Sequence, residues 1–254
     1  MQTWISKLNE LEKKGQPLII ATLVQSSGST PRKPGAKMII SQSGEFFGTI
    51  GGGELEKKVL DDSKLIFESE TTQTRSYDLF TEKGEGCGGT AIVLFETINQ
   101  GPHLYIFGAG HVGLALCRVL NETPFIVHLI DEREEWVFSK TVSDAVIRHR
   151  EHWKNFLETL RWNKDKTYIA IMTPHHKFDQ HVLELVIDKP TKYVGLMGSQ
   201  NKWQSIRGQL IEKGVKEIDL NRVCCPIGLP VGGKSPPEIA ISISAELLKV
   251  HYGK

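Results

Sequence analysis

The spacing of apolar positions divides the chain into two halves with different patterns. In the first half, short apolar runs separated by turn residues predict strands, and two amphipathic stretches predict helices. Helices are expected over residues 3–14 and after Glu54, and strands over residues 17–24, 36–41, 45–48, 74–78 and 90–96. The turn-forming residues 26–31 are expected to end the first strand. This half is therefore predicted to be α+β and to begin as a β-meander.

From His103 onward, apolar strand segments alternate with helical ones. This alternation indicates a parallel sheet with helices on both faces. Strands are expected over residues 103–107, 125–130, 145–149, 168–172 and 193–197, and helices over residues 112–120, 152–160, 177–188, 200–213 and 239–250. Residues 99–102, Asn-Gln-Gly-Pro, have the chemistry of a linker. The predicted fold class is α/β, with a smaller α+β domain (residues 1–100) before a Rossmann-like domain (residues 101–254).

Composition and charge argue against some classes of binding partner but do not identify a partner. The 31 Lys and Arg residues nearly balance the 30 Asp and Glu residues, and the basic residues are dispersed, so neither nucleic acid nor a membrane surface is an expected partner. No apolar run approaches the roughly 20 residues that span a bilayer. The four cysteines lack Cys-x-x-Cys spacing, which favours a reduced, cytoplasmic setting.

The strongest motif is the run Gly-Ala-Gly-His-Val-Gly at residues 108–113. It directly follows an apolar strand and opens a helix, which is the context that the dinucleotide fingerprint requires. Gly108, Gly110 and Gly113 would permit the tight turn, the approach of a pyrophosphate and helix packing, and the helix start would attract the anion. Asp131 ends the next strand, where its carboxylate could accept from a ribose hydroxyl. Other molecules that carry a phosphate or pyrophosphate satisfy the same requirements as NAD.

Two further glycine loops lie in the first half. Gly51, Gly52 and Gly53 precede Glu54 at a predicted helix start, and their amides could cradle an anion. In the loop Gly-Cys-Gly-Gly at residues 86–89, small neighbours could expose the Cys87 thiol to sulfur or metal chemistry. A tight turn and a buried structural cysteine are the alternative interpretations of these two loops.

Two segments of the second half resemble functional motifs, one a metal or acid–base site and the other a P-loop. In each case the neighbouring sequence also supports an ordinary structural role. His175, His176, Asp179 and His181 follow a strand and could supply metal ligands or a general base, but such residues are also ordinary in loops. Residues 228–235 match the spacing of a phosphate-binding P-loop. Pro236 and Pro237 oppose the helix start that a P-loop needs, so we expect a chance match, with Glu238 in the first turn of the last helix.

The chain resembles the XdhC/CoxI family of xanthine dehydrogenase accessory factors. The resemblance covers nearly the whole chain and rests on separated blocks in the same order: residues 27–32, 34–38, 48–56, 86–89, 108–113, 195–199, 226–229, 236–240 and 243–246. It implies a chaperone, rather than an enzyme, that binds the molybdenum cofactor (molybdopterin) and protects it during sulfuration. The cofactor would then pass to apo xanthine dehydrogenase, an enzyme of purine catabolism, or to a related molybdenum hydroxylase.

The resemblance also sets the expected site and partners. The ligand is expected between the two halves, facing Arg32, Gly51, Gly52, Gly53 and Glu54 on one side and Gly108, Gly110, His111, Gly113, Asp131, Gly198 and Ser199 on the other. Cys87 is the expected contact with the sulfur shell of the metal. A cysteine desulfurase is a further expected partner, and a homodimer is the expected assembly.

Two other functions are consistent with the same residues. An NAD(P)-dependent oxidoreductase would use the fingerprint and Asp131, with His175 or His176 as acid–base group. A scaffold that docks onto the hydroxylase would bind no ligand at all.

Overall fold

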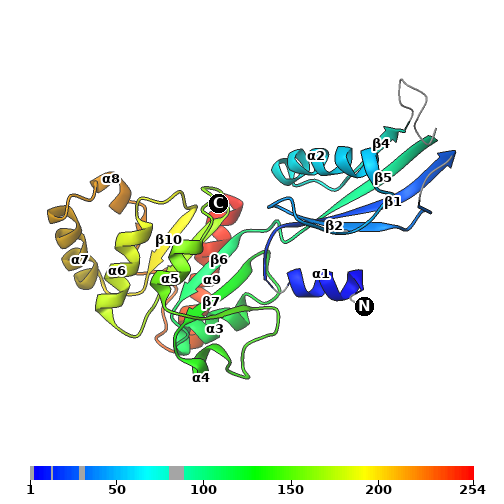
Figure 1. The fold of residues 1–254 in the computed structure, drawn as a ribbon. Helices are drawn as coiled ribbons and strands as arrows, with labels where there is room; N and C mark the ends of the chain where they lie inside the picture. Colours follow the sequence, from blue (N-terminus) through cyan, green and yellow to red (C-terminus); the bar gives the residue numbers. More distant parts are fainter. Residues whose placement is uncertain (1–2, 13, 29–31, 80–88) are drawn as a thin grey trace. The chain divides into compact units, whose positions relative to one another are not determined.

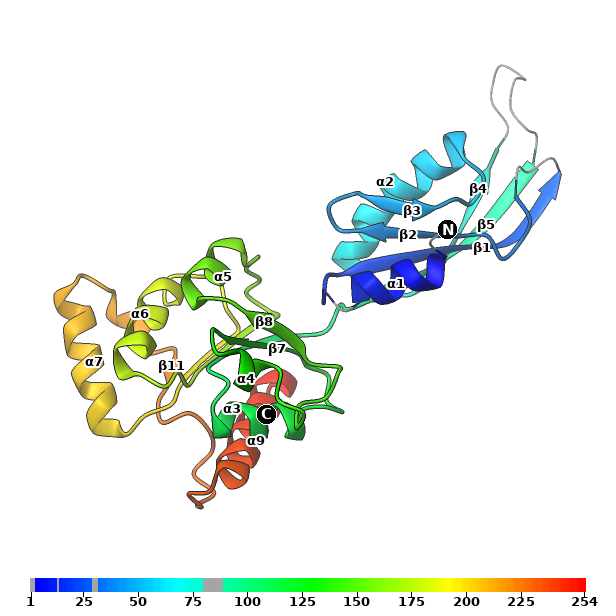
Figure 2. The same cartoon turned by 60° about the horizontal axis from the view of Figure 1, so that its bottom comes forward.

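The structure is a computed structural model that describes residues 3–12, 14–28, 32–79 and 89–254. It forms two compact units, residues 1–100 and residues 101–254 (Figures 1 and 2). Among the described residues, no helix combines the length and the apolar character that crossing a bilayer demands.

The N-terminal unit is built on an antiparallel sheet. Its strands are β1 (Leu18–Gly28), β2 (Lys37–Ser41), β3 (Phe46–Gly48), β4 (Gln73–Asp78) and β5 (Gly89–Ile98), in the order β3-β2-β1-β5-β4. Residues 26–28 were expected to form a turn, and that prediction was wrong. They continue β1, because their ladder with β5 extends to the pair Gly28 and Gly89 beyond an irregularity between Leu23 and Gln25.

Helices cover both faces of this sheet. The long helix α2 (Gly53–Ser69) packs its buried residues, among them Leu55, Val59 and Ile66, against alternate residues of β1, β2 and β5. The short helix α1 (Trp4–Glu12) contacts β2 and β3. Residues 18–23 of β1 are all buried, as expected for a strand that is covered on both sides.

The C-terminal unit contains six parallel strands. These are β6 (His103–Phe107), β7 (Ile126–Asp131), β8 (Ile147–Arg150), β9 (Thr167–Ile171), β10 (Tyr193–Leu196) and β11 (Val223–Cys224). Their order is β11-β10-β9-β6-β7-β8, which is the 3-2-1-4-5-6 order of dinucleotide-binding folds counted from the other edge. The predicted α/β fold class with a Rossmann-like C-terminal sheet is confirmed. The order reverses between β6 and β9, where this fold places ligands.

Helices lie on both faces of the parallel sheet (Figure 1). They are α3 (His111–Val119), α4 (Glu134–Val137), α5 (Trp153–Thr159), α6 (His176–Val186), α7 (Gln200–Glu212), α8 (Glu217–Leu220) and α9 (Pro236–Tyr252). One apolar core joins the sheet to α3 and α9, and a second joins it to α5, α6 and α7.

The start of α9 explains the P-loop-like sequence. Ser235 is the N-cap, and Pro236 is the first helical residue. The Glu238 carboxylate accepts from the backbone N–H groups of Lys234 (3.0 Å) and Ser235 (2.9 Å). The predicted position of Glu238 in the first turn is therefore confirmed. Amides that would hold a phosphate in a P-loop here serve a capping box.

Three histidines form a hydrogen-bonded row across β6, β7 and β8. His103 Nδ1 lies 2.9 Å from His128 Nε2, and His128 Nδ1 lies 3.0 Å from His149 Nε2. Burial, followed by the neighbouring rings, lowers the pKa of His128, and burial lowers the pKa of His149 to about 4. Tyr105 stacks on His128. His128 and His149 are therefore neutral in the folded protein near pH 7.

We predict that the C-terminal unit loses stability as the pH falls from about 6.5 toward about 4. The unfolded chain takes up protons on His149 near pH 6.5, whereas the folded chain does so only near pH 4, at a cost on the order of 3 kcal/mol. Urea unfolding between pH 7 and pH 5, above the main range of carboxylate titration, measures this slope. His149→Phe should reduce the slope, of which buried His128 keeps a part, and His175→Phe, at an exposed position, should leave it unchanged. An unchanged slope in His149→Phe would contradict the prediction.

Candidate functional site

The three glycines of the loop after β6 differ in whether the structure requires glycine at their position. A Cβ at Gly108 would overlap the carbonyl oxygen of Met172, and one at Gly113 would overlap the carbonyl oxygen of Gly108. Gly108 also has a φ of +120°, which side chains disfavour. Gly110 differs, because its φ is −69° and nothing lies within 4 Å of a Cβ built there. Neither backbone nor packing requires glycine at this position, so the open space suits a ligand.

The helix that starts at this loop lacks a side-chain cap. Gly110 is the N-cap of α3, and no side chain caps the helix there. His111, the first helical residue, is exposed. Uncapped amides and the positive end of the helix dipole favour an anion such as a phosphate.

Asp131, at the end of β7, clamps this loop. Its Oδ2 accepts from the backbone N–H of Ala109 at 2.8 Å, and Arg133 donates to both carboxylate oxygens. Burial raises the pKa of Asp131, but hydrogen bonds from Arg133 and Ala109 outweigh it and lower the pKa overall. A ribose hydroxyl was the expected partner of Asp131, whereas the donors seen here belong to the protein.

Arg133 and Trp136 are neighbours of the loop that the sequence interpretation missed. The guanidinium of Arg133 lies over the Trp136 ring, 5.1 Å from its centroid. Trp136 meets His111 edge-on, with ring centroids 5.0 Å apart. These three residues therefore form a continuous row beside the loop. The signal that could have revealed it was a basic residue two positions after the strand-ending aspartate.

The adjacent loops along the same edge of the sheet are joined by a buried ion pair. Lys202 of α7 donates to Asp179 Oδ2 at 2.6 Å and to the carbonyl oxygen of Met197 at 2.9 Å. Thr173 donates to Asp179 Oδ1 through both its N–H and its hydroxyl. The Asp179 side chain is only 2% exposed. The pair ties the loop after β9 to the loop after β10.

The Asp179 carboxylate does not hydrogen-bond to the histidine rings that follow β9, so it does not orient either of them as a general base. His175 and His176 are exposed. His176 Nδ1 lies 3.8 Å from Asp179 Oδ2, which exceeds hydrogen-bond distance. Over the described ranges, no group of His, Cys, Asp and Glu side chains is arranged to hold a metal ion.

Gly198 and Ser199, also expected at the ligand site, lie after β10. The Ser199 hydroxyl caps α7 by accepting from the N–H of Lys202 at 3.2 Å. The Cys225 thiol lies 3.8 Å from the Gly198 carbonyl oxygen. Burial raises the pKa of Cys225, and that of Cys224, to about 11, so both are protonated thiols at neutral pH.

In the N-terminal unit, the glycine loop at residues 51–53 already holds a carboxylate. Glu56 Oε1 accepts from the N–H groups of Gly52 (2.8 Å) and Ile50 (3.1 Å) and from the Thr49 hydroxyl (2.6 Å). Burial raises the pKa of Glu56, but these hydrogen bonds lower it overall. The glycine loop, which was expected to cradle an external anion, thus binds one from its own chain.

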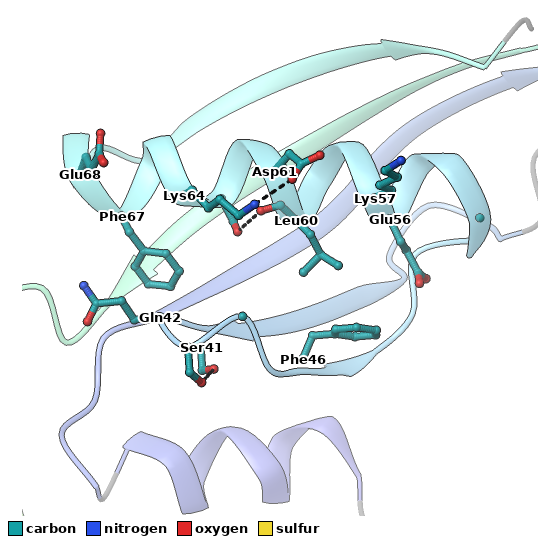
Figure 3. A pocket seen from close by; sticks show the side chains of 14 residues that line it. Ser41, Gln42, Phe46, Glu56, Lys57, Leu60, Asp61, Lys64, Phe67 and Glu68 are labelled. Carbon is teal, nitrogen blue, oxygen red and sulfur yellow. Dashed lines mark hydrogen bonds and ion pairs between the residues drawn. The ribbon is translucent and has the colours of Figure 1, made fainter.

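A pocket of about 740 Å³ lies beside this loop, between α2 and the hairpin of β2 and β3 (Figure 3). Phe46 of the hairpin and Phe67 of α2 give it aromatic walls. Its lining carries charges of both signs, from Lys57, Lys64, Asp61 and Glu68, and Lys64 is paired with Asp61 at 2.9 Å. Glu56 also lines it, so the loop and the pocket share a wall.

Three further residues of the N-terminal unit were expected at the ligand site. Arg32 and Glu54 are exposed, and Glu54 lies in the first turn of α2. Cys87 lies outside the described residues, so its expected contact with a metal stays a prediction.

Two family models match the chain. The model of the XdhC Rossmann domain matches residues 104–247, and the model of the XdhC and CoxI family matches residues 11–78. The first alone covers more than half of the sequence. The chain belongs to the XdhC family. The expected family resemblance is therefore confirmed.

The chain is also similar to proteins of known sequence or structure. The protein YqeB of Escherichia coli (strain K12) is 32% identical over 251 residues, which are 95% of this chain and 45% of YqeB, so the chain spans less than half of that relative. A protein of Bacillus subtilis (strain 168), named as a probable subunit of xanthine dehydrogenase, is 20% identical, with 98% of both chains covered. The crystal structure of a xanthine dehydrogenase from Bacillus halodurans shares the fold with a TM-score of 0.52, at 22% identity and with 96% of both chains covered.

We predict that Lys202→Met destabilises the C-terminal unit by about 3 kcal/mol, because it leaves the Asp179 carboxylate buried without its cation. Urea unfolding followed by tryptophan fluorescence, to which Trp203 in α7 contributes, measures the loss. Lys213→Met is the matched control, since Lys213 pairs with Glu184 at the surface and should cost less than about 1 kcal/mol. Equal losses in the two variants would contradict the prediction.

Proposed function

We propose that this protein is an accessory factor in the maturation of xanthine dehydrogenase or a related molybdenum hydroxylase. Support comes from the XdhC family matches in both units and from the relative in Bacillus subtilis, whose name places it with xanthine dehydrogenase. The role is that of a chaperone, which binds a cargo and hands it to an apo-enzyme.

The proposed cargo is the molybdenum cofactor, and the observation that carries this proposal is the open space at Gly110. The cofactor has a phosphate, and the uncapped start of α3 offers amides to an anion. Gly110 and His111 would hold that phosphate through their backbone. When bound, the cargo carries the redox-active metal that the target enzyme needs.

Sulfuration of the cargo while it is bound completes the proposal. A cysteine desulfurase would supply the sulfur, and Cys87 would contact the sulfur shell of the metal, as the family resemblance implies. The apo-hydroxylase is the final partner, and we expect the chaperone to act as a homodimer in the cytoplasm.

The oxidoreductase alternative gains no support from the loop after β9. Asp179, the carboxylate that could orient His176 as a general base, is engaged by Lys202 and Thr173 instead. The Rossmann fold by itself does not distinguish a hydride-transfer enzyme from a carrier.

We predict that Gly110→Val abolishes cofactor binding without unfolding the protein. At a φ of −69° and ψ of −175° valine is tolerated, but its methyl groups would fill the space proposed for the phosphate. The test is anoxic incubation of the full chain with molybdenum cofactor, followed by desalting and assay of bound pterin and molybdenum.

Gly208→Val is the matched control, because a Cβ at Gly208 in α7 also meets nothing within 4 Å and lies away from the loop after β6. It should bind cofactor like the parent protein. Cys87→Ala should retain the pterin but fail to activate the apo-hydroxylase. No cofactor on the parent protein, or full binding by Gly110→Val, would overturn the proposal.

A further inference from the structure

The Asp131 carboxylate has no acceptor position left for a ligand. Oδ1 accepts from the N–H of Arg133 at 3.0 Å and from its Nε at 2.9 Å. Oδ2 accepts from the N–H of Ala109 at 2.8 Å and from Arg133 Nη2 at 2.7 Å. A carboxylate offers about four lone-pair positions, and these four donors fill them. A ribose diol could bind Asp131 only by displacing Arg133.

Arg133, in contrast, keeps donors that Asp131 does not use. A guanidinium has about five N–H donors, and the pair with Asp131 uses one on Nε and one on Nη2. The side chain is 34% exposed and lies over Trp136, which limits its rotation. The Arg133 guanidinium is therefore held in one orientation at the end of β7, beside the glycine loop.

The topology of the sheet indicates which part of a ligand would lie at the end of β7, beside Arg133. In the strand order seen here, the pyrophosphate of a dinucleotide sits at the loop after the first strand, β6, and the adenosine ribose at the end of the second, β7. A free carboxylate at that point selects ribose hydroxyls, whereas an arginine accommodates a ribose phosphate. Guanidinium groups suit phosphate because they bind it through two parallel hydrogen bonds.

Nearby carboxylates weaken the positive electrostatic field of the Arg133 side chain. Glu134 is paired with Arg150 at 2.6 Å, and Glu132 lies 3.6 Å from His152. Glu135 acts on Arg133 through its charge. Because these groups weaken the positive field without occupying the guanidinium, the expected discrimination is on the order of tenfold rather than many thousandfold.

We propose that the Rossmann unit binds a dinucleotide whose adenosine ribose carries a phosphate, NADP(H) in preference to NAD(H), with Arg133 as the specificity-determining residue. His111 and Trp136 form the side of the site next to the pyrophosphate loop. The proposal goes beyond the maturation role and does not depend on it, because the molybdenum cofactor has no ribose phosphate to meet Arg133. Both ligands would use the Gly110 and His111 amides, so they would bind one at a time.

Calorimetric titration of the full chain with NADP⁺, NAD⁺ and coenzyme A tests the proposal. NADP⁺ should bind at least tenfold more tightly than NAD⁺. Coenzyme A, which carries a ribose 3′-phosphate but is no dinucleotide, should bind more weakly than NADP⁺. Arg133→Ala should lower the affinity for NADP⁺ about tenfold but should not lower that for NAD⁺, because it frees acceptor positions of Asp131 for ribose hydroxyls. Arg150→Ala, which removes the exposed arginine at the end of β8, is the matched control and should retain the preference for NADP⁺.

Saturable binding of NAD⁺ as tight as that of NADP⁺ would overturn the proposal, as would the absence of binding by either. Coenzyme A that binds as tightly as NADP⁺ would overturn the assignment to a dinucleotide. Failure to bind molybdenum cofactor alongside retained NADP⁺ preference would defeat the proposed function alone, so the two proposals fail separately.

Discussion

The hydrogen bonds of the Asp131 carboxylate hold the candidate site of the C-terminal unit in its geometry. They join the end of β7 to the second residue of the glycine loop and fix Arg133 beside it. The loop itself is shaped by contacts that leave no room for side chains at Gly108 and Gly113. With these points fixed, Gly110 and the start of α3 form an open, uncapped position at the switch point of the sheet.

The chain repeatedly uses its own carboxylates where a glycine motif offers backbone amides. Glu56 fills the loop at residues 51–53, and Glu238 fills the amides before α9. Burial raises the pKa of Glu56, but its hydrogen bonds lower that pKa overall. The hydrogen bond from the Ser235 hydroxyl, followed by those from the backbone, lowers the pKa of Glu238. The start of α3, like that of α2, has no side-chain cap, and in its loop Asp131 accepts from the N–H of Ala109. The amides proposed to bind an external anion there are those of Gly110 and His111.

The sequence was sufficient to predict most of the fold because its periodicities are strong. The alternation of strands and helices after His103 predicted the parallel sheet, and the fingerprint predicted its first turn. Very short elements, α4, α8 and β11, were missed, since two to four residues carry no periodic signal. The extension of β1 through Gly28 was missed because turn-forming residues can continue a strand when a partner strand pairs with them.

The site was less predictable, because it depends on which partner each polar group chooses. The sequence identified Asp131 by its place after the second strand, but not that Arg133 and Ala109 would saturate it. It likewise identified the loop at residues 51–53 as a source of donors but not that Glu56 would accept from it. Spacing determines which residues are neighbours. It does not determine how acceptor positions are shared among several donors.

The most direct measurement is a crystal structure of the full chain with NADP⁺ bound. The expected result is a pyrophosphate at the Gly110 and His111 amides and a ribose phosphate on Arg133, with Asp131 still bonded to Ala109 and Arg133. Ribose hydroxyls on Asp131, with Arg133 displaced, would contradict the proposed role of Arg133, because the clamp would then be a ligand-binding group.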